Sequence, residues 1–304
     1  MRYYCAPLEG ITDHVYRQVH HKFYPGVDRY YTPFLSPTVH RGLTQKERRE
    51  IPSADSIGYH AVPQILTKNP EDFLWLAHQC HNLGYAEVNL NLGCPSGTVT
   101  AKGKGSGMLR NLDDLDRFLD AIYSGTDIPI SIKTRIGYES PDEFPKILDI
   151  YNQYPICELI IHPRVRNAFY NGSVDMQIFQ YAVSHSRNPL CYNGDITKLT
   201  QISALPAVEA VMIGRGLVAN PGMLSATQDR QTLQQFLHTL LSTYIHVFGN
   251  SRNAMFRLKE HWHYLQNRFD NCEKYVKQLR KTTDVDQFFA LSDLILTQCP
   301  YHPE

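Results

Sequence analysis

Long apolar segments are missing from this sequence, in which no apolar run approaches the roughly 18 residues that a membrane-spanning helix needs. Residues 1–7 also lack the apolar segment of a signal peptide. We therefore expect a cytoplasmic protein that has no membrane partner.

Paired cysteines are missing as well. The 304 residues include seven cysteines, an odd number, and no two of them form a C-x-x-C pair. This usage supports neither a disulfide framework nor a zinc site, so we predict no bound metal. Most of the cysteines are expected in the core, because free Cys is among the most buried residue types. Cys94 differs, since Gly93 and Pro95 place it in a turn.

An excess of either charge is also missing, because 30 Lys and Arg residues balance 30 Asp and Glu residues. This balance excludes binding to nucleic acid through overall basicity. A hydrophobic fraction of 42% with 11% aromatic residues excludes an intrinsically disordered chain, which has too little apolar surface to offset its ordering entropy. The length allows one large domain and a smaller one.

Eight short apolar or β-branched segments lie in the first 215 residues, and segments with helical spacing separate most of them. The expected strands are 3–6, 28–31, 59–65, 87–91, 128–133, 158–162, 189–193 and 209–213. Helix starts are indicated at Asn69 before Pro70, at Asn111 and at Ser140 before Pro141. This alternation predicts a (β/α)8 TIM barrel, although an open doubly wound sheet would give a similar pattern.

Polar residues at the strand ends favour the barrel. The residues at or just beyond a strand end are Gln64, Asn91, Lys133, His162, Asn193 and Arg215. In a closed barrel these ends converge on one rim, where the active sites of TIM barrels lie, whereas an open sheet would spread them along an edge. We therefore predict a TIM barrel over residues 1–225.

The last two expected strands are each followed by glycine beside polar residues, in 193–195 (Asn-Gly-Asp) and 214–216 (Gly-Arg-Gly). Exposed backbone N–H groups beside a guanidinium bind phosphate, and loops after strands seven and eight are a common phosphate site of TIM barrels. The alternative is that the glycines only permit tight turns and that Arg215 is a solvated surface charge.

Lys133 lies in an otherwise apolar strand, where a lysine needs an electron-rich neighbour. The imidazole of His162 can hydrogen-bond a carbonyl or a ring nitrogen, although a lone histidine at a strand end is more often structural. Together with Gln64 and a phosphate site, these residues suit a phosphorylated, electron-accepting ring system such as FMN.

Cys94 has two functional interpretations, as a nucleophile or as a general acid. A nucleophile needs a nearby base, whereas a free thiol with a pKa of about 8.5 is mostly protonated at neutral pH and can donate its proton. The glycine-rich run 102–107 lacks the position and spacing of a dinucleotide-binding fingerprint. We interpret it as a mobile basic loop carrying Lys102 and Lys104, with an ordinary surface loop as the alternative.

After about residue 225 helical spacing continues to the end, which predicts a small all-helical domain over residues 226–304. The residues expected in its core are Met255, Leu258, Trp262, Leu265 and Phe269, while Arg257, His261, Tyr264 and Arg268 form a second stripe. Residues 252–281 contain eight Lys or Arg and three Asp or Glu. We interpret this excess as a phosphate-contacting surface, although a solvated helix face would have the same composition.

Together these segments resemble the tRNA-dihydrouridine synthase (Dus) family of the bacterial type, flavoenzymes that reduce uridine to 5,6-dihydrouridine in tRNA. The matching segments are 6–13, 62–66, 89–96, 132–135, 161–164, 169–172, 193–195 and 214–216. The Asn-x-Gly-Cys-Pro loop at 91–95, combined with Asn-Gly-Asp and Gly-Arg-Gly at barrel spacing, is the specific part of the match.

The resemblance implies a set of site residues. The residues implied for FMN are Pro7, Leu8, Glu9, Gln64, Lys133, His162, Asn193, Gly194, Asp195, Gly214 and Arg215. Those implied or expected on the substrate side are Asn91 and Tyr170 for the target base, with Arg164, Lys102 and Lys104. Family members often carry a lysine soon after the cysteine and proline, but here Gly97 follows Ser96. Either Lys102 and Lys104 take over that RNA contact, or the RNA is held differently.

The resemblance also implies the reaction. FMN, reduced by NADPH, gives a hydride to C6 of uracil, and Cys94 gives a proton to C5 as the catalytic general acid. The target base must leave the folded tRNA to reach the site. We expect tRNA as the partner and no stable protein partner. The alternatives are an FMN-dependent barrel reductase of a free small molecule, similar to a dihydroorotate dehydrogenase, and an RNA-binding protein without catalysis.

Overall fold

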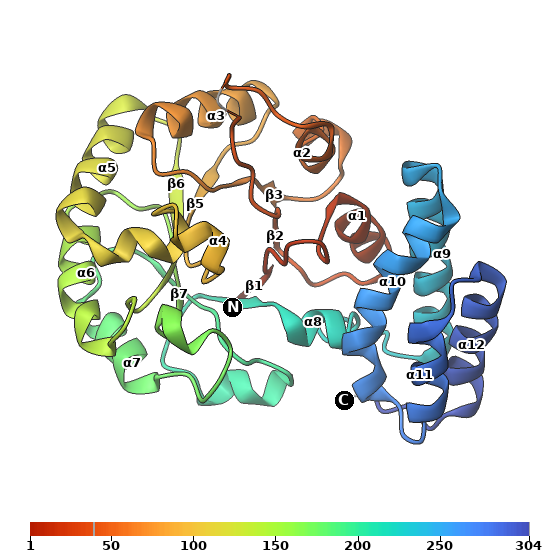
Figure 1. Ribbon diagram of the computed structural model, residues 1–304. Helices are drawn as coiled ribbons and strands as arrows, with labels where there is room; N and C mark the ends of the chain where they lie inside the picture. The colour runs from red at the N-terminus through yellow and green to blue at the C-terminus, as the bar shows by residue number, and fades with distance from the viewer. Residues whose placement is uncertain (39, 304) are drawn as a thin grey trace. The chain divides into compact units, whose positions relative to one another are not determined.

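The computed structural model describes residues 1–38 and 40–303 (Figure 1). The chain forms two compact units. The first consists of residues 1–7, 28–194 and 204–212, and the second of residues 8–27, 195–203 and 213–304. The boundary expected near residue 225 stays a prediction. Within the described residues, no helix is both long enough and apolar enough to cross a membrane.

Parallel strands form a nine-stranded sheet in the order β3-β2-β1-β9-β8-β7-β6-β5-β4. Their bounds are β1 Arg2–Cys5, β2 Arg29–Tyr31, β3 Ala61–Val62, β4 Gln64–Ile65, β5 Val88–Leu92, β6 Ile130–Arg135, β7 Leu159–His162, β8 Leu190–Tyr192 and β9 Ala210–Ile213. A single residue, Pro63, separates β3 from β4, so the two ends of the sheet meet in one interrupted strand. The expected strand 59–65 is split because proline has no N–H to donate to a neighbouring strand. The result is a nearly closed barrel, which confirms the predicted TIM-barrel fold.

Helices surround the strands of the first unit (Figure 1). They are α2 Gln45–Glu50, α3 Pro70–Asn82, α4 Gly97–Thr100, α5 Leu112–Gly125, α6 Phe144–Tyr151 and α7 Met176–His185. The Asn69 side chain caps α3 by accepting from the backbone N–H of Asp72, and Asn111 caps α5 in the same way. The expected start at Ser140 is a short 3-10 helix, η3 Pro141–Glu143, which leads into α6. Because helices cover the outside of the sheet, its strands are largely buried on both faces, and all five residues of β5 are buried.

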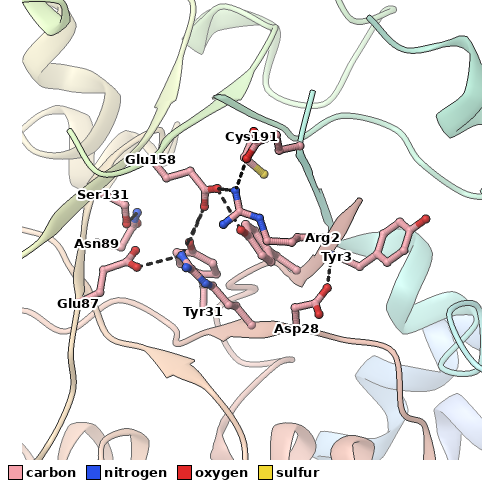
Figure 2. A network of polar contacts seen from close by, with 12 residues as sticks. Arg2, Tyr3, Asp28, Tyr31, Glu87, Asn89, Ser131, Glu158 and Cys191 are labelled. Atoms are coloured by element: carbon pink, nitrogen blue, oxygen red, sulfur yellow. Dashed lines mark hydrogen bonds and ion pairs between the residues drawn. The ribbon is translucent and has the colours of Figure 1, made fainter. Parts of the chain in front are cut away.

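A charged network lies in the barrel at the starts of the strands (Figure 2). Glu87 and Glu158 directly precede β5 and β7. Arg29 Nη1 lies 2.9 Å from a Glu87 carboxylate oxygen, and Arg2 Nη2 lies 3.3 Å from one of Glu158. The Tyr4 hydroxyl donates to Glu158 over 3.0 Å. This network lies at the end of the barrel that serves stability, away from the carboxyl ends of the strands.

The second unit is helical. Its helices are α1 His14–Phe23, α8 Arg215–Ala219, α9 Arg230–Phe248, α10 Ser251–Leu265, α11 Glu273–Lys281 and α12 Val285–Gln298. Gly249, with a positive φ of 62°, ends α9, and Asn250 caps α10. The five apolar residues expected in the core, from Met255 to Phe269, are all buried. The predicted helical C-terminal region is therefore confirmed.

Residues of the second stripe on α10 contact other parts of this unit. His261 is 1% exposed, and its ring stacks on Tyr16 of α1 with the ring centroids 5.1 Å apart. Burial lowers the pKa of His261 to about 3, so the ring is neutral. Arg257 donates to the backbone carbonyl of Gly10, and the buried Lys259 donates to that of Thr282. Arg257 and Lys259, two of the eight cations counted in residues 252–281, therefore make contacts inside the helical unit.

Candidate active site

A chain of side-chain hydrogen bonds crosses three neighbouring strands of the barrel. Asn91 Nδ2 donates to Gln64 Oε1 over 2.7 Å, and Gln64 Nε2 donates to Asn89 Oδ1 over 2.8 Å. Asn89 Nδ2 then donates to Ser131 Oγ over 2.8 Å. Strand register aligns these residues, since Gln64 pairs with Asn89 and Asn89 with Ser131. The chain fixes the orientation of both predicted site residues, Gln64 and Asn91.

Cys94 is held on both sides of its peptide unit. Its backbone N–H donates to Asn91 Oδ1 over 2.9 Å, and its carbonyl accepts from Ser106 Oγ over 2.7 Å. Gly105 lies so close that a Cβ there would be 3.0 Å from Cys94 Cβ, and its φ is +58°. The thiol-bearing residue is half-buried. Asn91 and the glycine-rich run therefore position Cys94 together.

The glycine-rich run differs from the mobile loop expected from its composition. Residues 105–110 form the 3-10 helix η2, in which Gly105, Ser106 and Gly107 are buried. Of the two lysines just before it, Lys102 is exposed and Lys104 is half-buried. The glycines are explained by close packing, because a Cβ at Gly107 would lie 2.8 Å from the Thr100 carbonyl oxygen.

Lys133 pairs with Asn91 in the register of β5 and β6 and is half-buried in the barrel. Burial, reinforced by the Arg135 charge, lowers the pKa of the Lys133 ammonium to about 8, while Cys191 and Cys94 act in the opposite direction. Among residues 1–38 and 40–303, no side chain or carbonyl accepts a hydrogen bond from this ammonium. A buried cation normally has such an acceptor, so an electron-rich ligand would satisfy it.

Arg135 contacts the loop of the candidate site, and the sequence assigned it no role. Its Nε donates to the Gly93 carbonyl over 3.0 Å, and its Nη1 donates to the Val165 carbonyl over 2.9 Å. It therefore joins the Cys94 loop to the loop after β7. The available signal was its spacing, since residues two apart on a strand share a face, and Lys133 is two residues before it.

His162, Arg164 and Tyr170 lie together. Arg164 Nη1 lies 3.1 Å from His162 Nε2, and because arginine only donates, Nε2 accepts and the proton of a neutral ring is on Nδ1. The His162 and Tyr170 rings stack with centroids 6.0 Å apart. Tyr170 is 48% exposed, whereas Arg164 is 3% exposed. The Arg164 guanidinium thus supports His162 from inside the protein.

Some of the residues expected around a phosphate belong to the first unit and the others to the second. In the first unit, Asn193 Nδ2 donates to the Met212 carbonyl over 2.8 Å, and a Cβ at Gly194 would lie 2.8 Å from the Tyr192 hydroxyl. In the second unit, Arg215 Nη2 donates to Asp195 Oδ1 over 2.8 Å, next to Gly214. Both partners of this pair are partly exposed, so the Arg215 guanidinium pairs with a carboxylate and also faces solvent.

The residues expected at the end of the first strand also belong to different units. Pro7 belongs to the first unit, and Leu8 and Glu9 belong to the second. Leu8 begins a turn, since its carbonyl accepts from the N–H groups of Ile11 and Thr12 at 3.0 Å each. Leu8 is half-buried and Glu9 is exposed. No group of three potential metal-ligating side chains is found in the described residues.

Comparison with known proteins identifies the family. The family model for dihydrouridine synthase (Dus) matches residues 4–295. The chain is 28% identical over 229 residues to tRNA-dihydrouridine synthase B of Proteus vulgaris, covering 74% of this chain and 70% of that protein. It is 28% identical over 256 residues to a probable tRNA-dihydrouridine synthase of Staphylococcus aureus strain Mu50, covering 80% and 76%.

A solved structure, described as a variant of NCR from Zymomonas mobilis, shares the fold. It superimposes with a TM-score of 0.51 at 10% identity and covers 77% of this chain and 87% of that one. This likeness concerns the barrel fold alone. The match of the family model over nearly the whole length decides the family: the chain belongs to the dihydrouridine synthases.

Proposed function

We propose that this protein reduces uridine to 5,6-dihydrouridine in tRNA, with FMN as its flavin and NADPH as the electron source. The observation that carries the proposal is the half-buried Lys133 ammonium, which has no acceptor in the described residues and lies in the register of β5 and β6 beside Asn91. Family membership and the names of the relatives support uridine in tRNA as the substrate.

The residues present suit a flavin. Lys133 offers a cation to an electron-rich ring, and the buried amide of Gln64 and the imidazole of His162 offer hydrogen bonds. Bound FMN would supply the two electrons that reduce the C5–C6 double bond of uracil, delivered at C6, and NADPH would replace them. From the sequence motifs we further propose Pro7, Leu8 and Glu9 as lining residues. The proposed phosphate ligands are Asn193, Gly194, Asp195, Gly214 and Arg215.

Cys94 gives the proton that C5 of uracil requires. Its peptide N–H is bound by Asn91 and its carbonyl by Ser106, so the thiol starts from a fixed backbone. The cations Lys133 and Arg135 interact electrostatically with Cys94 and stabilise the thiolate that remains. A proton from solvent restores the thiol before the next cycle.

The target base lies between Asn91 and Tyr170 in this proposal. Asn91 Nδ2 uses one hydrogen for Gln64, and its second can reach a uracil carbonyl. The exposed Tyr170 ring, stacked on His162, offers a flat surface for the base. Arg164 acts on the substrate through His162, whose ring it holds.

The helical region, residues 226–304, is proposed to bind tRNA. Lys274, Lys277 and Lys281 are exposed on one face of α11 at a spacing of three and four residues. Such a row suits successive phosphates, and Lys102 and Lys104 add positive charge near Cys94. The overall charge balance is compatible with local binding of this kind.

Two experiments on purified protein test the proposal. First, the protein is incubated with FMN and desalted, and flavin absorbance is measured. Retained flavin is expected, and a colourless protein would contradict the flavin role. Second, the loaded protein is given NADPH together with either an unmodified tRNA transcript or orotate, whose C5–C6 double bond can accept the two electrons. Dihydrouridine in the transcript is expected; turnover of the small molecule alone would favour the alternative reductase.

A further inference from the structure

The loop after β7 exposes two neighbouring aromatic rings. Phe169 is 40% exposed and Tyr170 is 48% exposed. The Tyr170 ring stacks on His162, whereas the Phe169 ring lies against the Arg166 guanidinium, with 5.1 Å between guanidinium carbon and ring centroid. Consecutive residues thus present their rings to different neighbours, and only Tyr170 belongs to the site proposed above.

The backbone at Phe169 is strained. Asn171 N–H donates to the Ala168 carbonyl over 2.8 Å, which closes a four-residue turn with Phe169 in its second position. Phe169 has φ 49° and ψ −103°, values that such turns usually give to glycine. A bulky ring at positive φ is unfavourable, and such strain persists where the surrounding structure enforces it, commonly at functional sites.

The loop around this turn is fixed by hydrogen bonds. Arg166 N–H donates to the Gly137 carbonyl over 2.9 Å, and Asn167 N–H donates to the Tyr138 carbonyl over 3.2 Å. Beyond the turn, Arg164 Nη2 donates to the Gly172 carbonyl over 2.5 Å. The strained turn is therefore held from both sides, and the Phe169 ring is presented in a set position.

One guanidinium, that of Arg166, lies against this ring, and a second, that of Arg110, lies over the Tyr138 ring that Arg166 also contacts. The Arg166 guanidinium lies 5.1 Å from the Phe169 ring and 5.2 Å from the Tyr138 ring, and Arg110 covers Tyr138 at 4.1 Å. Arg166 Nη2 also donates to Thr100 Oγ1 over 3.1 Å, in α4 just after Cys94. An exposed ring combined with guanidinium groups suits a nucleobase and its phosphate.

We propose that Phe169 stacks on the nucleobase next to the target uridine and fills the space that this uridine leaves in the base stack. The proposal rests on the proposed reduction of uridine in tRNA. A base that leaves a folded RNA loses its stacking, and an inserted apolar ring offsets that loss. Because Phe169 and Tyr170 are consecutive, the bases they contact would be neighbours in the RNA.

The test is a double-mutant cycle between Phe169 and the RNA. A tRNA transcript is first treated with wild-type protein, and the position of the reduced uridine is mapped. Transcripts are then made with an abasic nucleotide on the 5′ or the 3′ side of that uridine. We expect Phe169→Ala to slow reduction of intact tRNA about tenfold, in line with the contribution of one stacked base. On one of the two abasic transcripts, the same substitution is expected to cost less than about twofold.

Three further variants separate folding from stacking. Phe169→Tyr keeps the ring and should match the wild type, as should Leu199→Ala, a substitution of another exposed apolar residue. Phe169→Gly suits the turn, so it should slow reduction like Phe169→Ala while the melting temperature stays equal or rises.

Two results would overturn the role of Phe169: a wild-type rate for Phe169→Ala on intact tRNA, or an equal penalty on intact and both abasic transcripts. A wild-type protein that reduces no uridine would instead overturn the proposed function, so the two failures are distinguishable.

Discussion

Asn91 and Cys94 are joined by a hydrogen bond in which the Cys94 backbone N–H donates to Asn91 Oδ1 over 2.9 Å. The other end of the Asn91 amide donates to Gln64 Oε1 over 2.7 Å, so the side chain links the Cys94 loop to the interior of the barrel. The position of the proposed acid therefore depends on an amide chain that ends at Ser131.

Replacing Asn91 by Asp tests this link. The carboxylate can still accept from Cys94, but it cannot donate to Gln64, whose Oε1 would face a second acceptor. We expect dihydrouridine formation to fall at least about tenfold, with most of the flavin retained. Single-turnover reduction of tRNA by flavin-loaded protein measures the effect. A wild-type rate would show that the position of Cys94 does not depend on Asn91.

Replacing Cys94 by Ala removes the proposed proton donor. A positioned general acid typically contributes about 10²- to 10⁴-fold, so we expect a loss of that order in uridine reduction. Oxidation of NADPH should continue, because Cys94 has no part in that step, and flavin content should be unchanged. Cys157→Ala, at an exposed cysteine, is the matched control. Unchanged turnover of Cys94→Ala on tRNA would remove Cys94 from the mechanism.

Lys133 makes the stability of the flavin-free protein depend on pH. Its pKa of about 8 in the fold is lower than the ordinary value of 10.5, so between these values the unfolded chain binds a proton that the folded chain has lost. The free energy of unfolding therefore rises with pH over this window, and the destabilisation is fully present below pH 8.

The comparison with Lys133→Met isolates this contribution. We expect the variant to be more stable at pH 7 by on the order of 2 kcal/mol and to lack the part of the pH dependence due to Lys133. Urea unfolding of flavin-free protein at pH 7 and pH 10 measures both effects. Lys146→Met, at an exposed lysine, should behave like the wild type. Identical profiles for Lys133→Met and the wild type would contradict the assignment.

The exposed lysines of α11 should determine how salt affects tRNA binding. Replacing Lys274, Lys277 and Lys281 by Gln should reduce the slope of log affinity against log salt by about 2 to 3. Lys259→Gln is the contrasting variant, because Lys259 is buried and donates to the Thr282 carbonyl. It should lower stability and leave the slope unchanged. An unchanged slope in the triple variant would place the RNA elsewhere.

Much of the barrel was predictable because its strands are short, apolar and followed by polar residues. Gln64, Asn91, Lys133 and His162 were predicted as site residues in this way, since the end of a strand places a side chain on the rim. The split at Pro63 follows from the missing N–H of proline, yet the expected strand ran through it.

The remaining features depend on distant partners. The internal role of Arg135 becomes visible only when the loops at Gly93 and Val165 are placed beside it. The contact between Arg164 and His162 also becomes visible only in the folded chain. His261 likewise lies on a helix whose periodicity permits burial or exposure, and Tyr16 of α1 decides the outcome. Periodicity alone contains no information about such partners.

The central claim, reduction of uridine in tRNA, is tested most directly by mapping dihydrouridine in RNA from cells with and without this gene. We predict that dihydrouridine at one or more tRNA positions is lost without the gene and is restored by the wild-type gene but not by one encoding Cys94→Ala. Identical maps at every tRNA position would contradict the claim and favour a small-molecule substrate.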